Sequence, residues 1–115
     1  MKIQINTDKN IAGSEQLHAR TEAVIAARLG RFRSQLTRIE AHLSDENGLK
    51  AGQDDKKCVL EARPEGMQPV AATHSAATLD QAIAGAADKL QRLLESAFGQ
   101  LNAQERGAAG RQPVP

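Results

Sequence analysis

Aromatic residues and cysteine are almost absent from this chain of 115 residues. Phe32 and Phe98 are its only aromatic residues, and Trp and Tyr do not occur. Because proteins that bind single-stranded nucleic acid stack the bases on aromatic side chains, this scarcity argues against a stacking platform. Cys58 is the single cysteine, which excludes an intrachain disulfide and a zinc site made of several cysteines.

Long hydrophobic runs and an excess of one charge are also missing. No stretch approaches the roughly 20 apolar residues that cross a bilayer, and the N-terminal residues lack the apolar segment of a secretory signal. The chain has 15 Lys and Arg against 14 Asp and Glu, a formal net charge of +1, which excludes a strongly basic histone-like protein and an acidic tail protein. Length and composition predict one domain in a reducing compartment, most simply the cytoplasm.

Catalytic and metal-binding motifs are not found either. His18, His42 and His74 are too widely separated in sequence to suggest metal ligands, and the acidic residues of segment 45–55 are typical of a solvated loop. Cys58 is predicted to be a buried small hydrophobic residue rather than a nucleophile. Glycine-rich phosphate loops and the nucleophile elbow are lacking. We therefore predict that the protein is not an enzyme and uses no cofactor and no metal.

Hydrophobic periodicity predicts four strands and two helices. Alternation of polar and apolar residues indicates strands at residues 2–6, 38–44, 57–63 and, more weakly, 70–74. Apolar spacings of three and four indicate one helix over 15–35, capped by Ser14, and a second over 79–101, where Thr78 and Gln81 fit a capping box. Residues 45–55 are predicted to form a loop. A domain at 1–101 is expected to be followed by a disordered tail at 102–115.

The element order predicts an α+β fold with a four-stranded sheet. Each helix has one apolar face, so both helices are expected to cover the same face of the sheet. A right-handed crossover through the first helix would make the first two strands parallel, and the short links that follow would form antiparallel hairpins. His74 is expected to face the core. The open face of the sheet would carry the following side chains in water: Glu40, His42, Glu61 and Arg63.

Basic side chains concentrate in the first predicted helix. Residues 14–38 hold five arginines against two glutamates, a net charge of +3. A helical wheel places Arg20 and Arg31 close together, with Arg28 about 60° further round, while Lys89 and Arg92 are neighbours on the second helix. Guanidinium and ammonium groups suit contacts with phosphates, so these five cations are candidates for binding RNA.

A solvated, locally paired surface is the alternative interpretation of these cations. Arg92 can pair with Asp88 and Glu95 on its own helix, and Glu22 lies near Arg20 in the sequence. Exposed pairs of this kind are common on helices and contribute only about 0.3–0.5 kcal/mol each. The charge pattern alone therefore leaves both interpretations open.

Two short motifs carry a resemblance to a known family. The first is RLGRF at residues 28–32, followed by LTRI at residues 36–39; the second is LDQAI at residues 79–83, followed by DKLQRLL at residues 88–94. Both resemble the short ribosome hibernation-promoting factors and ribosome-associated inhibitors of bacteria, in the sigma-54 modulation protein family. The resemblance covers about residues 1–98.

The resemblance implies a double-stranded-RNA-binding-like fold, β-α-β-β-β-α, and a non-enzymatic translation inhibitor. Such a protein would bind the small (30S) ribosomal subunit and its rRNA in the channel used by mRNA and tRNA, and would engage no membrane, no DNA and no small-molecule substrate. With Arg20 added from the same helix flank, the RNA-binding residues are then Arg20, Arg28, Arg31, Lys89 and Arg92. The alternative function is a protein-interaction module of the same fold that has lost its affinity for RNA, which the near-zero net charge favours.

Overall fold

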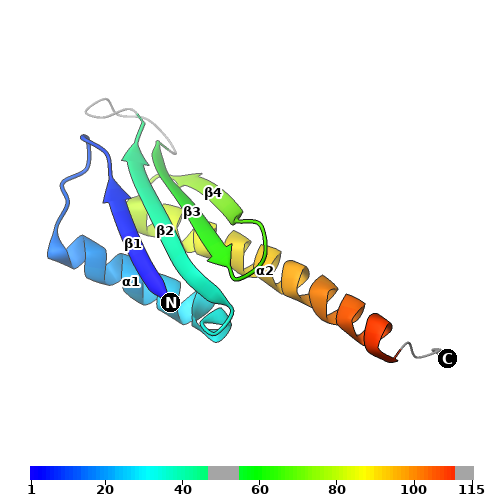
Figure 1. Cartoon of the computed structure of the whole chain (residues 1–115). Coiled ribbons are helices and arrows are strands. Elements are labelled where there is room, and N and C mark those ends of the chain that lie inside the picture. The colour runs from blue at the N-terminus through cyan, green and yellow to red at the C-terminus, as the bar shows by residue number, and fades with distance from the viewer. Residues whose placement is uncertain (47–54, 111–115) are drawn as a thin grey trace.

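The computed structural model describes residues 1–46 and 55–110, with side chains described up to residue 99. Its elements follow the chain in the predicted order (Figure 1). They are β1 (Lys2–Thr7), α1 (Glu15–Leu29), the short 3-10 helix η1 (Gly30–Phe32), β2 (Leu36–Asp45), β3 (Lys56–Pro64), β4 (Val70–Ala76) and α2 (Leu79–Gly110). The four strands, the two helices and the α+β class are therefore confirmed.

The four strands form one mixed sheet in the order β1-β2-β3-β4. β1 runs parallel to β2, with Ile3 opposite Ile39, whereas β2, β3 and β4 pair in antiparallel fashion, with Leu60 between Ala41 and Ala72. The predicted parallel pair and the predicted hairpins are both confirmed. The two-residue alternation of the strands sends these apolar side chains to one face of the sheet.

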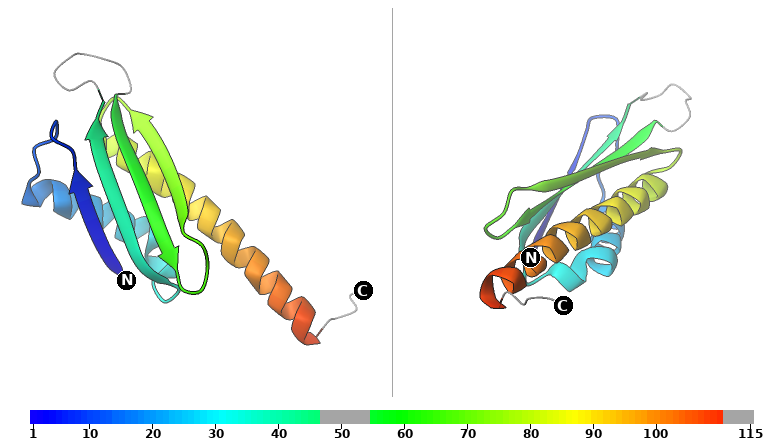
Figure 2. Two further views of the ribbon diagram at one scale, coloured as in Figure 1. Left: turned by 45° about the horizontal axis from the view of Figure 1, so that its top comes forward. Right: turned by 90° about the vertical axis from the view of Figure 1, so that its right-hand side faces the viewer.

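Both helices cover that apolar face and leave the other face open (Figure 2, right). The largest fully buried side chains come from α1, the central strands and α2. They include Ile25, Leu29, Ile39, Leu43, Leu60, Ile83, Leu90 and Leu94. Burying one such side chain contributes roughly 1.5–3 kcal/mol, so this single core dominates the stability of the fold.

Side chains cap the first turns of both helices, as the sequence predicts. The Ser14 hydroxyl accepts a hydrogen bond from the backbone N–H of Leu17 at 3.0 Å, and the Thr78 hydroxyl accepts one from the N–H of Gln81 at 3.1 Å. Each bond satisfies a backbone donor that the helix itself leaves unpaired. The two caps therefore fix where α1 and α2 begin.

The end of the first helix differs from the prediction of residue 35. α1 ends at Leu29, and Gly30 begins the 3-10 turn η1, which ends at Phe32. Apolar spacing alone counts the buried side chain of Phe32 as one more position of the helical stripe. A tighter 3-10 turn places that ring on the core while the chain turns toward β2, which begins at Leu36.

The second helix is longer than predicted. α2 continues to Gly110, so the expected end near residue 101 is wrong, and residues 102–110 are helical rather than a tail without secondary structure. The prediction stops where the apolar stripe stops. A helix needs no apolar partner to continue, however, and an interior glycine costs only about 1 kcal/mol relative to alanine. Residues 111–115 of the predicted tail and 47–54 of the predicted loop lie outside the described residues.

Candidate nucleic-acid interface

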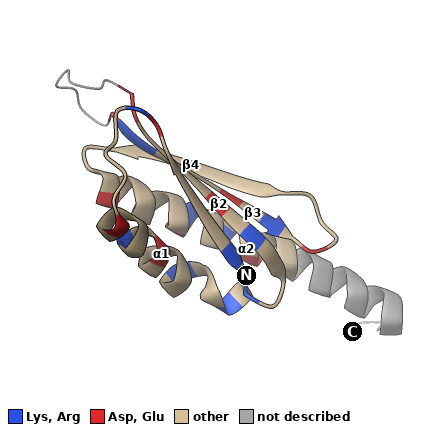
Figure 3. Ribbon diagram, turned by 60° about the vertical axis from the view of Figure 1, so that its left-hand side comes forward, with Lys and Arg blue, Asp and Glu red and all other residues tan. Residues whose placement is uncertain are grey.

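The three predicted arginines of the first helical segment lie along the seam between the helices. Arg20 pairs with Asp80, their Nε and Oδ1 atoms 3.3 Å apart. Arg28 pairs with Asp88, and Arg31 with Glu95. Partner numbers rise together on the two helices, which shows that α1 and α2 run in the same direction. Figure 3 shows acidic and basic residues side by side along this helical layer.

The core-facing stripe of α1 explains why these arginines reach that seam. Arg20 and Arg28 each directly precede a buried residue, Thr21 and Leu29 respectively. A step of one residue turns a side chain by about 100° around the helix, from the core to its flank. The flank on which they lie is the one that faces α2, so their heads meet the carboxylates of that helix.

Arg31 is held at the end of this row by the two aromatic residues of the chain. Its guanidinium carbon lies 4.8 Å from the centroid of the Phe32 ring. The Phe32 ring in turn packs on Phe98 of α2, with ring centroids 5.5 Å apart. The cation–π contact adds to the ion pair with Glu95 and fixes the guanidinium between the two helices.

The two predicted cations of α2 have no carboxylate partner within residues 1–46 and 55–99. Lys89 Nζ donates to the backbone carbonyl of Thr73 in the edge strand β4 at 3.0 Å, so its charge is not neutralised. Arg92 is exposed on the same stretch of helix. The pairing of Arg92 within its own helix, one of the possibilities left open by the sequence, does not occur among the described side chains, because Asp88 and Glu95 pair with arginines from the first helical segment.

The structure therefore gathers four of the five predicted residues around one stretch of α2, residues 88–95. Arg28 and Arg31 reach it through Asp88 and Glu95, while Lys89 and Arg92 belong to it. Arg20 lies further along the seam, beside Asp80 at the first turn of α2. Five cations here face three carboxylates, which leaves a local formal charge of +2. We name these five cations the helix-layer cations; their role in binding RNA stays a prediction.

The open face of the sheet holds a second group of cations, of which only Arg63 is predicted there from the sequence. Strand register sets Lys2, Arg38 and Arg63 opposite one another across β1, β2 and β3. The next row contains Glu40 opposite Glu61. Alternation within each strand predicts only which face a residue occupies. The row itself depends on the register between strands, and no single strand encodes it.

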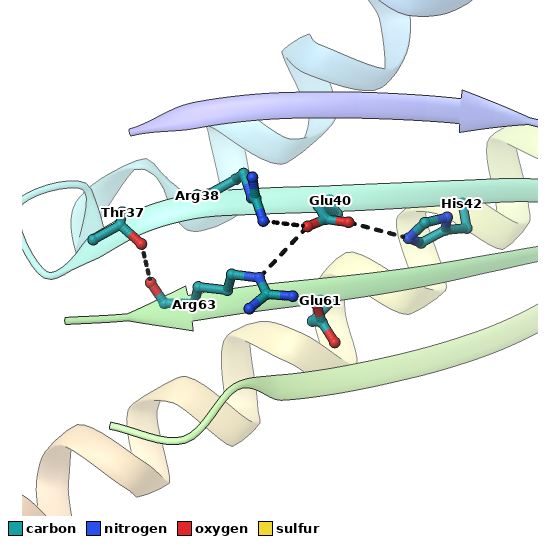
Figure 4. Close-up of polar contacts among 6 residues, drawn as sticks. All are labelled: Thr37, Arg38, Glu40, His42, Glu61 and Arg63. Carbon is teal, nitrogen blue, oxygen red and sulfur yellow. Dashed lines mark hydrogen bonds and ion pairs between the residues drawn. The ribbon is translucent and has the colours of Figure 1, made fainter. Parts of the chain in front are cut away.

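These sheet arginines form ion pairs with the glutamates of the next row (Figure 4). Glu40 Oε2 forms an ion pair with Arg38 Nη2 at 2.8 Å and lies 3.5 Å from Arg63 Nε, and Glu40 Oε1 lies 3.6 Å from His42 Nε2. Arg63 Nη2 donates to Glu61 at 2.9 Å. The predicted outward orientation of these side chains is confirmed. Only 16% of the Glu40 side chain is exposed, however, so the network is half-buried rather than freely solvated.

A separate ion cluster closes the opposite end of the sheet. Lys56 Nζ lies 3.1 Å from Asp55 Oδ1 and 3.4 Å from Asp45 Oδ2, and both aspartates are buried. The hydrogen bond between Asp55 and Lys56 lowers the pKa of Asp55 and raises the pKa of Lys56. This cluster holds the end of β2 and the start of β3 together.

Cys58 and His74 both pack within the fold. Burial raises the pKa of the Cys58 thiol to about 12, which keeps it a protonated core residue, as expected. His74 is half-buried, and its ring lies against Gly85 of α2. Across the described part of the chain, no three His, Cys, Asp or Glu side chains are grouped as metal ligands. No helix within it is both long and apolar enough to span a membrane.

Comparison with solved structures finds proteins that share this fold. The N-terminal domain of Protein Y from Thermus thermophilus superposes with a TM-score of 0.66 at 22% identity, covering 84% of this chain and 98% of that one. A ribosomal subunit interface protein from Coxiella burnetii gives a TM-score of 0.62 at 17% identity, covering 90% and 99%. These likenesses show a shared fold.

Sequence comparison identifies the family. A search of curated proteins found no significant match. The model of the family described as Sigma 54 modulation protein / S30EA ribosomal protein matches residues 3–102. Because that match spans most of its 115 residues, the chain belongs to this ribosome-associated family.

Proposed function

We propose that the protein binds the small ribosomal subunit through its helix-layer cations and inhibits translation as a hibernation factor. The bound RNA would be the rRNA that lines the channel for mRNA and tRNA. Membership of a ribosome-associated family supports this proposal, as does the fold shared with a ribosomal subunit interface protein. The observation that carries it is the gathering of Arg28, Arg31, Lys89 and Arg92 around residues 88–95 of α2.

Rigid RNA helices suit such a surface because proteins recognise them mainly by shape and through phosphates. The three ion pairs in the seam do not block this contact, since they lie in solvent. The arginine side chains are 37–55% exposed, and exposed pairs are worth about 0–1 kcal/mol. A phosphate offers a guanidinium two acceptor oxygens in a matching geometry and can replace the carboxylate.

The helical layer is a better phosphate-binding surface than the open face of the sheet. On the sheet, Arg38 and Arg63 share Glu40, whose half-buried carboxylate holds both guanidinium groups in place. Pulling either arginine away would leave a poorly hydrated carboxylate without its cation, which is costly. In the helical layer Arg92 has no carboxylate partner among the described side chains, and the paired acids are well exposed.

The test compares two variants that lose the same charge. R28Q/R31Q/R92Q removes three helix-layer cations, and K2Q/K9Q/K57Q removes three lysines outside the two helices, from β1, the segment that follows it and β3. Lys89 is left in place because it also holds the edge carbonyl of Thr73. Binding to purified 30S particles would be measured by co-sedimentation over a range of salt concentrations.

We expect the helix-layer variant to bind 30S particles more weakly and the lysine variant to retain the wild-type affinity. Each lost phosphate contact should lower the slope of log affinity against log salt by about 1, so the helix-layer variant should lose about 3. Equal losses in the two variants would show that only net charge matters. A wild-type protein that stays at the top of the gradient at low salt would refute ribosome binding itself.

One observation favours the alternative of a protein-interaction module without RNA affinity. Three of the five predicted cations already have carboxylate partners, so the helical layer is closer to neutral than the sequence predicts. Pull-down from lysate with and without ribonuclease separates the two functions. Partners that survive the nuclease support the module, whereas nuclease-sensitive association with ribosomal components supports the hibernation factor.

A further inference from the structure

We propose that the carboxylates of α2 make the helix layer selective against RNA duplexes outside the ribosome. This inference rests on the proposed function, because it assigns a role to the acids that face the helix-layer cations. Asp80, Asp88 and Glu95 each meet one arginine across the seam. They would act as specificity-determining residues, lowering the affinity of the layer for phosphate backbones that offer nothing besides charge.

The acids of α2 pair with arginines of the first helical segment, although a cation was available on α2 itself. Arg92 lies four residues after Asp88 and three residues before Glu95, spacings at which side chains on one helix meet. Glu22 lies two residues after Arg20, a spacing that turns the two side chains away from each other. Glu22 has no ion-pair partner among the residues with described side chains. The acids of α2 reach across to the first helical segment instead. Each arginine proposed to bind phosphate in that segment therefore has one carboxylate within reach of its guanidinium.

A carboxylate beside an arginine weakens contacts with phosphate in two ways. The guanidinium must exchange one anion for another, so the new ion pair brings little net gain. The carboxylate that is left behind then lies close to the phosphate, and like charges repel. An unrelated duplex offers only its backbone and meets this penalty in full. A site whose fixed phosphates meet the cations without approaching the carboxylates meets a smaller penalty, and this difference between the two penalties makes the layer selective.

Stability alone does not explain these acids. The carboxylate side chains are 42–70% exposed, and exposed ion pairs add little to folding. Contact between the helices is already provided by Phe32 on Phe98. Asp80 is a partial exception, since an acid in the first turn also favours the positive end of α2. The test therefore leaves Asp80 unchanged and uses Asp88 and Glu95.

The experiment uses the full chain and two variants that gain the same charge. D88N/E95Q releases Arg28 and Arg31, and E22Q/E65Q removes two exposed acids that form no ion pair among the described residues. Fluorescence anisotropy would measure binding to a labelled RNA duplex of about 16 base pairs, roughly the length that a double-stranded-RNA-binding domain spans. Co-sedimentation would measure binding of the same proteins to 30S particles.

We expect D88N/E95Q to bind the duplex about three- to tenfold more tightly than wild type at low salt, and E22Q/E65Q to change by less than about twofold. Affinity for 30S should rise less, so the ratio of 30S to duplex affinity should fall. An unchanged duplex affinity, or equal gains in both variants, would overturn the proposal.

Two further measurements keep the result interpretable. Thermal unfolding of each variant checks the fold, and the single variants D88N and E95Q should each show part of the gain; no gain in either folded single variant also counts against the proposal. The 30S arm tests the proposed function separately. Wild-type protein that does not co-sediment with 30S particles would refute that function. The duplex measurement alone decides whether the acids lower the affinity of the arginines for phosphate.

Discussion

Replacing Gly85 by alanine tests the packing of α2 on the edge strand β4. A Cβ atom at this position would lie 2.1 Å from Cδ2 of His74 and 2.5 Å from both its Cγ and its Nε2. Rotating the ring about its own axis cannot relieve the contact, because Cγ itself is too close. Either the whole His74 side chain or the helix must move, and such overpacking typically costs about 1–3 kcal/mol.

Helix propensity acts in the opposite direction. Alanine is favoured over glycine by about 1 kcal/mol inside a helix, so G85A should change the free energy of unfolding by a net loss of about 0–2 kcal/mol. In an H74A background the ring is gone, and G85A should then stabilise the protein by about 1 kcal/mol. The coupling between the two sites is therefore expected to be about 1–3 kcal/mol.

Urea unfolding of the four proteins of this double-mutant cycle gives the coupling directly. Gly99 provides a matched control in the same helix. A Cβ atom added there would meet nothing within 4 Å, so G99A should simply stabilise the protein by up to about 1 kcal/mol. If G85A stabilises the protein equally with and without His74, the close approach of the ring to α2 is wrong.

Two further perturbations test other parts of the fold. S14A removes the acceptor for the Leu17 N–H and should cost about 1 kcal/mol in urea unfolding, with a loss near zero contradicting the cap. Because the pKa of Asp55 lies below its ordinary value in the folded protein, its carboxylate stabilises the wild-type fold at neutral pH. This contribution is lost as the pH falls below about 4. K56M leaves Asp45 beside Asp55 without their shared cation. The stability of K56M relative to wild type should therefore be lowest near neutral pH and should recover toward about pH 4. Thermal unfolding profiles that run parallel to wild type across this pH range would refute the prediction.

Local periodicity is enough to predict the elements because each has one buried face. Alternation over β2 places Ile39, Ala41 and Leu43 inward, and all three are buried. The stripe along α2 likewise identifies buried residues such as Leu90 and Leu94. Helix ends are less predictable, since apolar spacing reports burial rather than backbone conformation. Phe32 is buried from a 3-10 turn, and α2 continues well beyond Leu94 to Gly110.

The candidate site was predictable by residue type but not by partner. The sequence shows that Arg28 and Arg92 are basic and that Asp88 and Glu95 are acidic. It cannot show which cation reaches which acid, because that depends on how two helices far apart in the chain pack side by side. The cation row on the open face, centred on Arg38, was invisible for the same reason, since it requires the register of three strands.

The near-neutral charge of the chain constrains how it can bind a polyanion. A net charge of +1 produces little long-range attraction, and salt screens what remains beyond about 8 Å under physiological conditions. Affinity must therefore come from contacts made at short range, where Arg92 and Lys89 present charges that no carboxylate of the described side chains cancels. Arginines in the seam can add their contacts only after a phosphate has come close enough to displace Asp88 or Glu95. Under the proposed function, such a surface would bind strongly only where several phosphates are already fixed in matching positions, as in folded ribosomal RNA and not along a flexible single strand.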